Sequence, residues 1–289
     1  MSADHSILIL AHNKAAYTRR CLRSLFLSSL RPFHVVLVNN GSTDETAQVF
    51  TEFADAAEKD RIDVTIVTLE KNEGAIVGRN RGLEKMTGRY WALLDNDVVV
   101  RTRSWLEKLS GVLDRDEKVG IVGAKLVYAS PPHNIQCAGC AVTRGGQVVF
   151  RGRGEPRTSA EFAAPADCQT LISACWLMRA DAAKKAGMLD EQFSPVQFED
   201  IDYCYRIREL GLACRYEPGV EMYHFENVTS GRTKELNYPY LTVKNGLKFK
   251  KKWQHRFSVE NGPLDKDWSW AQIKTIALED VPEVLETLP

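Results

Sequence analysis

Two aspartates, Asp95 and Asp97, stand two residues apart between the apolar runs 90–94 and 98–100. The first run is typical of a buried strand, so the acidic pair is expected at the end of a sheet. Carboxylate oxygens are hard ligands that suit Mg²⁺ or Mn²⁺, and such ions bind diphosphates. The pair therefore indicates a metal site for a diphosphate. The alternative is a strand that ends in an ordinary turn, where aspartate is also common.

The overall composition is that of a soluble globular protein. The 289 residues include 38 Lys and Arg against 38 Asp and Glu, so the formal net charge is zero and we expect no nucleic-acid partner. Asp4 and His5 stand where the apolar core of a signal peptide would begin, and no apolar run approaches the roughly 20 residues of a membrane span. Seven cysteines at irregular spacing favour reduced, buried thiols and a cytoplasmic protein.

Strands and helices alternate along the first hundred residues. Strands are predicted over 6–10, 34–38, 64–69 and 89–94, and helices over 14–30, from about 45, and over 75–86. This alternation predicts right-handed crossovers and a parallel sheet. Asn13 is expected to cap the first helix. Gly78 and Gly82 predict a close approach in the third helix. The later elements are helices over 105–113, 180–186 and 201–210, strands over 120–127 and 171–179, and a hairpin that turns at Gly145-Gly146; residues 220–224 are expected to complete the folded body.

Polar side chains follow each of the four strands in this half, at 11–13, 39–40, 72–74 and 95–97. Ligands of parallel sheets bind beyond the carboxyl ends of the strands, so the topology gathers these side chains on one rim. We expect a nucleotide site there. The half has no G-x-G-x-x-G after its first strand and no G-x-x-x-x-G-K-[ST], which argues against a dinucleotide cofactor and against a P-loop ATPase.

A second acidic group, Glu199, Asp200 and Asp202, begins a predicted helix. Acidic residues in a first turn often only complement the helix dipole, so local sequence leaves a chemical role open. His224 stands between two aromatic residues and is on local grounds a packed core histidine. The segment Cys137–Cys140 has the spacing of a zinc or redox pair, but no second pair is evident, so ordinary thiols are favoured.

Taken together, these segments resemble the family 2 glycosyltransferases over roughly residues 5–230. Each segment alone is weak evidence for the family, but the order and spacing of all the segments together are specific to it. The chain departs from the family at 10–13, where Leu-Ala-His-Asn replaces a frequent Pro-Thr-Tyr-Asn, and at Asn39-Asn40, where an acidic residue is frequent. The similar segments are SILILAHNK at 6–14, VNNGSTD at 38–44, NEGAIVGRNRG at 72–82, DND at 95–97, GMLDE at 187–191, EDIDYCYR at 199–206, and YEP at 216–218 before His224.

The resemblance implies the α/β fold named GT-A. It predicts a Rossmann-like nucleotide-binding half over 1–100, with a mixed and mostly parallel central sheet, and an acceptor-binding half over 101–230. Residues 231–289 would form a C-terminal helical extension. The basic, aromatic stretch 248–257 fits either a solvated helix face, which is favoured, or a surface for an anionic membrane or a pyrophosphate.

The resemblance also implies roles for nine residues. An Asn at position 40 can accept from the N3–H of uracil or thymine or donate to another base, so UDP, dTDP and GDP sugars all stay open as donors. The implied roles are metal ligands for Asp97 and His224, ribose and diphosphate contacts for Asp95 and Asn96, nucleobase contacts for Ala11 and Asn40, the general base for Asp200, and sugar contacts for Glu199 and Trp176.

The implied reaction is transfer of a sugar from a nucleotide diphosphate to an acceptor hydroxyl. Mn²⁺ or Mg²⁺ would neutralise the leaving diphosphate. One base and no evident protein nucleophile imply inversion, as in bacterial polysaccharide and rhamnosyl transfer. A nucleotidyltransferase is disfavoured because 11–14 lacks a glycine-rich loop. The remaining alternative is a non-catalytic glycan-binding or scaffold protein on a degenerate transferase fold, against which the intact acidic residues argue.

The acceptor stays open, because a lipid-linked sugar, the end of a polysaccharide, a small molecule and a protein side chain would each fit. The basic stretch near the C-terminus favours an acceptor at a membrane surface. We therefore expect a cytoplasmic enzyme, with peripheral contact at the inner face of the membrane as a further expectation.

Overall fold

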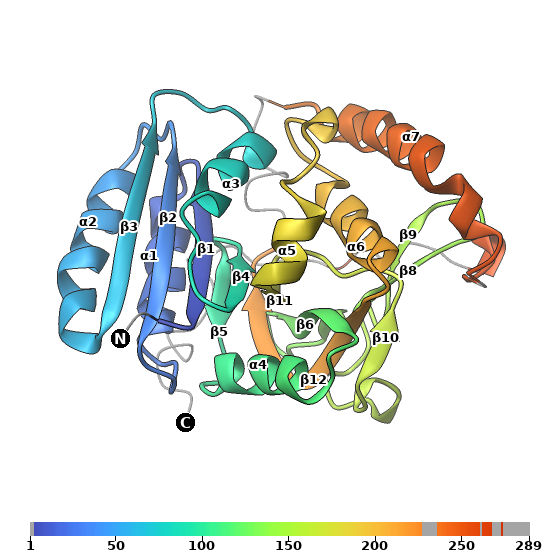
Figure 1. Ribbon diagram of the computed structural model, residues 1–289, viewed down its shortest axis with the longest axis horizontal. Coiled ribbons are helices and arrows are strands. Elements are labelled where there is room, and N and C mark those ends of the chain that lie inside the picture. Colours follow the sequence, from blue (N-terminus) through green and yellow to red (C-terminus); the bar gives the residue numbers. More distant parts are fainter. Residues whose placement is uncertain (1–2, 227–235, 261, 268–272, 274–289) are drawn as a thin grey trace.

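The computed structural model describes residues 3–226, 236–260, 262–267 and 273, and it places helices on both faces of one large sheet (Figure 1). The strands are β1 His5–Ala11, β2 Phe33–Asn40, β3 Ile62–Leu69, β4 Tyr90–Leu94, β5 Val98–Val100, β6 Val119–Tyr128, β7 Ile135–Cys137, β8 Cys140–Val142, β9 Val148–Phe150, β10 Ala166–Cys168, β11 Cys175–Arg179 and β12 Ala213–His224. The α-helices are α1 Ala15–Leu25, α2 Thr46–Ala57, α3 Ala75–Leu83, α4 Trp105–Arg115, α5 Ala180–Ala186, α6 Glu199–Glu209 and α7 Tyr238–Phe257.

The large sheet is mixed, as expected. Within the described residues its order is β10-β12-β6-β11-β4-β1-β2-β3, with β5 beside β12 and β7 beside β6. Strands β4, β1, β2 and β3 are parallel to one another, whereas β11 runs antiparallel to both β4 and β6. The parallel half therefore brings its strand ends to one rim. The predicted hairpin is also confirmed, since β8 and β9 pair antiparallel around Gly145-Gly146.

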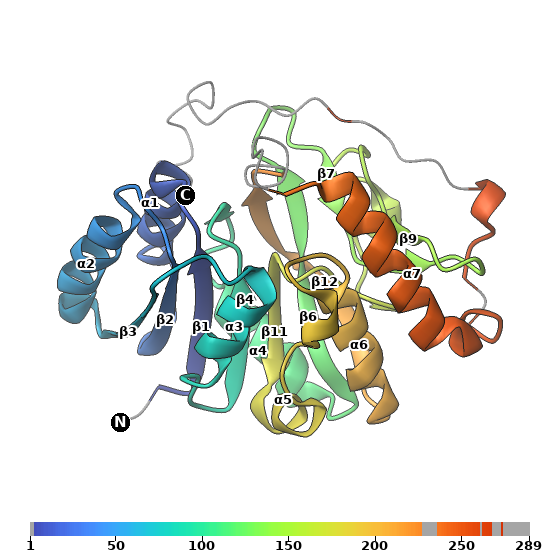
Figure 2. The ribbon, with the colours of Figure 1, turned by 90° about the horizontal axis from the view of Figure 1, so that it is seen from above.

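Alternating side chains of the central strands build two cores, one on each face of the sheet. In β1, Ile7 and Ile9 pack with residues of α1, α2 and α4, whereas Leu8 packs with residues of α3, α5 and α6. This alternation follows from the period of two of a strand, because successive side chains point to opposite faces. Figure 2 shows α1 on one side of the sheet and α3 and α5 on the other.

Helix α3 lies unusually close to β1. A Cβ built on Gly78 would stand 2.3 Å from Leu10 Cδ1, and one built on Gly82 would stand 2.2 Å from Leu8 Cδ1. The close approach predicted from these two glycines is therefore confirmed, and its partner is the strand below. Because Gly78 lies over Leu10, near the carboxyl end of β1, this packing places the N-terminal part of α3, including Arg79, at the rim of the sheet.

Helices α4, α5 and α6 agree with their predicted bounds within two residues, but other boundaries differ, and the strand predicted from residue 171 begins only at Cys175. Helix α1 ends at Leu25 and α3 at Leu83, several residues before the predicted ends. The expected cap at Asn13 is wrong, because Asn13 has φ 58° and its side-chain Oδ1 accepts from the N–H groups of Thr43, at 2.8 Å, and Asp44, at 3.3 Å. Asn13 thus ties the first rim loop to the second.

Helix α7 belongs to the second core. Its Phe249, Trp253 and Phe257 are buried in the same cluster as Tyr205 of α6. Part of the predicted extension 231–289 therefore packs on the body, and the rest lies largely outside the described residues. No helix in the described part of the chain is both long enough and apolar enough to cross a bilayer. The seven cysteines are free and buried, and the Sγ atoms of Cys137 and Cys140 lie 3.6 Å apart.

Candidate active site

The four predicted strand ends meet at the rim of the parallel half. His12 Nδ1 lies 2.9 Å from the carbonyl oxygen of Asn40, and Asn40 Nδ2 donates to Asn72 Oδ1 at 3.0 Å. The third loop is thus bonded to the second, and the second to the first. The gathering of polar groups that parallel topology predicts is present, although many of these groups bond to one another.

Asp95, Asp97 and His224 form a cluster at this rim. One possible ligand atom from each residue lies within 4.8 Å of the other two. The sheet explains how distant residues meet, because β5 pairs with β12 and sets Val98 opposite His224. His224 Nε2 lies 3.3 Å from Asp97 Oδ1, while its Nδ1 lies 2.6 Å from Gln136 Oε1. Gln136 therefore fixes the ring and leaves Nε2 facing the carboxylates.

Burial and proximity shift the pKa values of this cluster in a consistent way. Asp97 is only 8% exposed, and burial raises the pKa of its carboxyl against the opposing effect of His224. For His224 burial lowers the pKa, but the charges of Asp97 and Asp95 outweigh it and raise the pKa to about 9. The cluster consequently holds a proton on His224 at neutral pH, which a metal ion must displace.

Arg79 of α3 joins the Asp95 cluster to the second acidic group. Its guanidinium donates to Asp95 Oδ1 at 2.5 Å and to Glu199 Oε1 at 2.9 Å, and its side chain is 12% exposed. Burial by itself would lower the pKa of Arg79, but the surrounding carboxylates outweigh this effect and raise the pKa, so Arg79 stays protonated. One buried cation therefore lies between Asp95 and Glu199 and bonds to both side chains.

Glu199 and Asp200 begin α6 and differ in environment. Glu199 is 4% exposed, and burial together with the charge of Asp200 raises its pKa to about 7. Its Oε2 has no hydrogen-bond partner among the described residues. Asp200 is half-buried and accepts from the N–H groups of Ser173, at 3.2 Å, and Ile201, at 2.8 Å. Burial raises the pKa of Asp200 as well. Asp200 is thus the more accessible carboxylate of the two.

Ala11 and Asn40, which were expected to contact the nucleobase, lie at the rim with buried side chains, and their contact with a base stays a prediction. The Ala11 side chain is 0% exposed and that of Asn40 is 1% exposed. The Asn40 amide donates to Gly74 O at 3.1 Å as well as to Asn72, and it accepts from the N–H of Glu73 at 3.0 Å. Asn40 therefore shapes the loop after β3, and its amide is already occupied by protein partners.

Trp176 and Asn96 both make contacts within the protein, and their expected sugar and diphosphate contacts stay predictions. Trp176 is 0% exposed within β11, opposite Gly123 and Leu93. Its side chain points to one face of the sheet and packs in the second core beside Tyr203 of α6, which the local sequence could not reveal. Asn96 donates from its amide to Thr18 Oγ1 at 2.9 Å and so faces α1.

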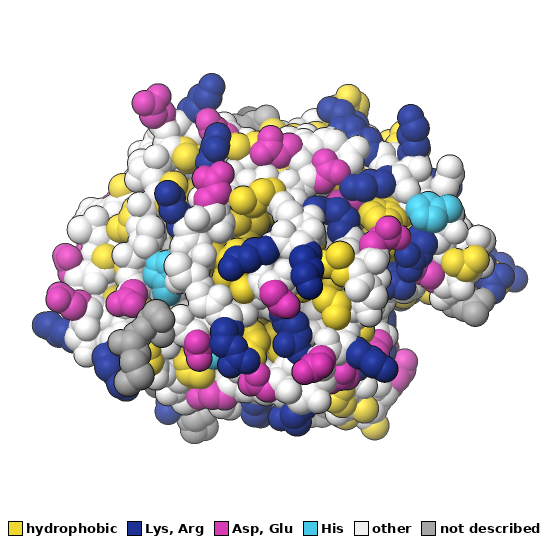
Figure 3. All heavy atoms as spheres, in the orientation of Figure 1, with side chains coloured by type: hydrophobic (Ala, Val, Ile, Leu, Met, Phe, Trp, Pro, Cys, Tyr) yellow, Lys and Arg dark blue, Asp and Glu magenta, His cyan; other side chains and the backbone are white. Residues whose placement is uncertain are grey.

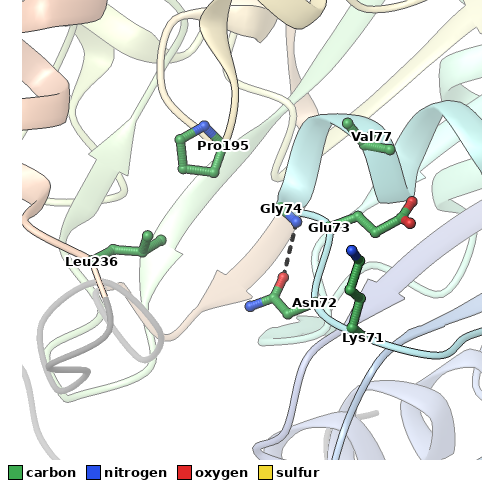
Figure 4. Close-up of a pocket in the computed structure, with 7 residues that line it drawn as sticks. All are labelled: Lys71, Asn72, Glu73, Gly74, Val77, Pro195 and Leu236. Carbon is green, nitrogen blue, oxygen red and sulfur yellow. Dashed lines mark hydrogen bonds between the residues drawn. The ribbon is translucent and has the colours of Figure 1, made fainter.

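A pocket of about 500 Å³ opens beside the N-terminus of α3 (Figure 4). The loop after β3 forms one wall, where the N–H of Gly74 donates to Asn72 Oδ1 at 2.9 Å. Pro195 forms the opposite wall, and its carbonyl accepts from the N–H of Ala75 at 2.8 Å. The lining residues are Lys71, Asn72, Glu73, Gly74, Val77, Pro195 and Leu236.

Sequence reasoning missed two residues that organise the site. Arg79 stands in the family-like segment 72–82, and an arginine on the helix that crosses the rim was an available signal for its role. Asn245 of α7 is fully buried and donates to the carbonyls of Phe193 and Val196 at 2.5 and 2.9 Å. The available signal for Asn245 was its place in the four-residue spacing of the apolar residues Leu241 and Phe249, which puts it on the buried side of α7.

With this geometry in place, comparison with known proteins identifies similar sequences. A model of "Glycosyl transferase family 2" matches residues 6–187. The pre-mycofactocin glycosyltransferase of Mycobacterium tuberculosis is 28% identical over 215 residues, which are 74% of this chain and 41% of that protein. The putative teichuronic acid biosynthesis glycosyltransferase TuaG of Bacillus subtilis is 27% identical over 122 residues, 42% of this chain and 47% of TuaG. The chain thus spans less than half the length of these curated relatives.

Solved structures show the same fold at low sequence identity. GalNAc-T7 with UDP, GalNAc and Mn²⁺ superposes with a TM-score of 0.69 at 16% identity, over 89% of this chain and 49% of GalNAc-T7. The mannosyltransferase PcManGT of Pyrobaculum calidifontis with GDP-Man and Mn²⁺ superposes with a TM-score of 0.59 at 16% identity, over 89% of this chain and 71% of PcManGT. The GT-A fold expected from the sequence is thereby confirmed.

Proposed function

The chain belongs to glycosyl transferase family 2, and we propose that it moves a sugar from a nucleotide diphosphate to an acceptor hydroxyl with inversion at the anomeric carbon. The observation that carries this proposal is the continuous polar centre at the sheet rim. The Asp95–Asp97–His224 cluster stands at one end of it, Arg79 in the middle, and Glu199 with Asp200 at the other. The residues proposed to act on the donor and those proposed to act on the acceptor are thus neighbours.

The donor set of the cluster fits a divalent ion, with Asp97 and His224 as its ligands and Asp95 toward the diphosphate. Two carboxylate oxygens and one imidazole nitrogen suit Mn²⁺ better than Mg²⁺, because Mg²⁺ prefers an all-oxygen shell. A divalent ion bound there would neutralise the charge that grows on the leaving diphosphate. Two structural neighbours with this fold were solved with Mn²⁺, which supports the same choice.

Asp200 is the proposed general base. It is half-buried, whereas Glu199 is nearly inaccessible and paired with Arg79. Backbone N–H groups on both of its oxygens orient the Asp200 carboxylate, which then removes the acceptor proton during attack. With one accessible base and no nucleophile assigned on the other side of the sugar, a single displacement follows, and hence inversion.

The donor is proposed to be a UDP or GDP sugar, with dTDP sugars as the remaining candidate class. The neighbours' ligands, UDP and GDP-Man, support the first two. Because Ala11 and Asn40 are buried, we propose that they frame the nucleotide loop, with Asn96 near the diphosphate. The half over 1–100 would bind the donor and the half over 101–230 the acceptor, which is a glycan or a lipid-linked sugar in cell-surface glycan assembly. A cytoplasmic location remains part of this proposal.

Thermal shift measurements test the proposal directly. UDP, dTDP, GDP and CDP are each added with Mn²⁺, with Mg²⁺ or with EDTA. A ligand at 100 times its dissociation constant stabilises the folded state by about 2.7 kcal/mol, which is readily visible. We expect one nucleotide to raise the Tm with Mn²⁺ and to lose this effect in EDTA and in Asp97→Asn.

The matched control is Asp63→Asn, an exposed aspartate on β3 away from the rim. It should keep the full shift. If no nucleotide raised the Tm of the wild-type protein with either metal, the site would be degenerate and the proposal refuted. Single-turnover assays then test the base: Asp200→Asn should bind the nucleotide normally but lose at least a hundredfold in transfer, in the range that general bases supply.

A further inference from the structure

We infer that the outer face of α7 binds an anionic lipid surface. This face consists of Tyr240, Val243, Lys244, Leu247 and Lys251, which follow one another at helical spacing. Tyr240 is 59% exposed, and Val243 and Leu247 are each 64% exposed, among the most exposed large apolar residues of the described chain. Apolar side chains at i, i+3 and i+7 form a stripe along one side of a helix.

The outer face does not serve the packing of α7. The opposite side carries Leu241, Asn245, Phe249, Trp253 and Phe257, four residues apart, and all five are buried. These residues hold the helix on the body through the second core and through hydrogen bonds to the 193–197 segment. The apolar residues of the outer face are therefore available to a partner without unfolding the helix.

The charge of α7 identifies the partner. The helix carries five lysines and one arginine and no acidic residue between Tyr238 and Phe257. Lys252 and Arg256 pair with carboxylates of the body, whereas Lys244, Lys250 and Lys251 are exposed. Figure 3 shows Lys and Arg side chains together with apolar ones over this part of the molecule.

Apolar side chains interleaved with lysines match the interface of an anionic bilayer. There, the apolar groups enter the headgroup boundary and the ammonium groups meet lipid phosphates. A purely electrostatic partner such as a nucleic acid would leave Val243 and Leu247 without a role. The observations therefore favour lipid over other polyanions.

The position of α7 connects this face to the proposed chemistry, and this step rests on the proposed function. Asn245 bonds to the segment that leads into Glu199 and Asp200, and Leu236, just before the helix, lines the pocket beside α3. A lipid-bound α7 would hold the base and the pocket next to the bilayer. The substrate class that fits this placement is an acceptor attached to a membrane lipid.

Vesicle co-sedimentation of the full chain tests the inference. The probe is phosphatidylcholine vesicles with one third phosphatidylglycerol, compared with pure phosphatidylcholine. Lys244→Glu/Lys251→Glu should weaken binding to the anionic vesicles about 30-fold or more, which equals the roughly 2 kcal/mol that two basic residues contribute. Its matched control is Lys59→Glu/Lys85→Glu, which makes the same charge change at exposed lysines elsewhere.

The apolar contribution is measured with Val243→Ser/Leu247→Ser, for which we expect at least a tenfold loss. The control is Ile66→Ser/Met188→Ser, at side chains 41% and 44% exposed. The inference is wrong if wild type binds both vesicle types equally weakly, or if each α7 variant binds like its control. A dimer that the α7 variants dissociate, without vesicle binding, would assign the face to a second copy instead.

Nucleotide thermal shifts without vesicles keep the two proposals apart. They depend on the rim cluster and should be unchanged in the α7 variants. If wild type did not bind vesicles but kept its nucleotide shifts, only the lipid surface would be refuted. Vesicle binding without a nucleotide shift would refute only the transferase site.

Discussion

The buried carboxyl of Glu199 should make the wild-type protein less stable at alkaline pH than a neutral replacement. Glu199 is 4% exposed, its Oε2 has no partner among the described residues, and its pKa rises from 4.5 to about 7. Between these pH values the folded state keeps a proton that the unfolded state has lost. Stability therefore falls as pH rises from 4.5 to 7 and then levels off.

The magnitude follows from the same pKa change. Each pKa unit corresponds to about 1.4 kcal/mol, so ionised Glu199 costs the folded state about 3 kcal/mol above pH 7. Glu199→Gln keeps the shape, and its amide oxygen can still accept from Arg79, but it carries no charge. We expect the variant to exceed wild type in unfolding free energy by about 3 kcal/mol at pH 8, with most of this gain absent at pH 5.

Urea unfolding of both proteins between pH 5 and pH 8 measures this difference, with metal excluded by EDTA. Glu260→Gln is a control of opposite sign. Burial opposes ionisation of Glu260, but hydrogen bonds from Gln169 and Arg208 outweigh it and lower its pKa, so this replacement should destabilise near neutral pH. If the difference in unfolding free energy between Glu199→Gln and wild type stayed constant from pH 5 to pH 8, the pKa of Glu199 would not be raised in the folded protein, and the reasoning would be refuted.

Three further predictions concern the metal cluster, the α3 packing and α7. Because the pKa of His224 is about 9, Mn²⁺ binding at pH 7.5 should release about one proton per ion. Titration calorimetry in buffers of different ionisation enthalpy measures the number of protons released. Binding of Mn²⁺ to His224→Gln should release none. Gly78→Ala should lower the free energy of unfolding in urea by about 1–3 kcal/mol, because its Cβ would meet a β1 leucine methyl at 2.3 Å. In the control Gly111→Ala the new Cβ lies near only a flexible arginine, so the free energy of unfolding should rise by up to about 1 kcal/mol. Equal effects of the two substitutions would contradict the packing argument. Asn245→Ala should speed protease cleavage within 193–197, because the substitution removes the hydrogen bonds to that segment. An unchanged cleavage rate would show that Asn245 does not hold the segment in place.

Local sequence was enough to predict the strands of the first half and their parallel direction. Apolar runs bounded by polar loops predict the ends of β1, β2, β3 and β4 within two residues. The reason is that a buried strand requires apolar side chains, whereas the loop that follows it is exposed to solvent and polar. Parallel connection by helices then requires the strand ends to share one rim. The position of the Asp95–Asp97 pair on that rim therefore follows from the parallel connection and the polarity pattern alone.

Helix ends and the identity of contacts could not be obtained in that way. Asn13 has the type and position of a cap, yet it bonds across to the second rim loop. Asn40 and Trp176 have suitable chemistry for ligands but are buried at 1% and 0% exposure. Exposure depends on which helices cover a strand, and those helices lie far away in the sequence.

Short motifs and periodic patterns were therefore enough to predict the family, the parallel half of the sheet and the acidic pair at its rim. Three features became visible only in the folded chain: His224 faces Asp97, Arg79 joins Asp95 to Glu199, and α7 turns an apolar and basic face outward. Each of these depends on residues far apart in the chain, 127 positions in the case of Asp97 and His224. Such pairs meet only through strand pairing and helix packing, whose geometry no local pattern encodes.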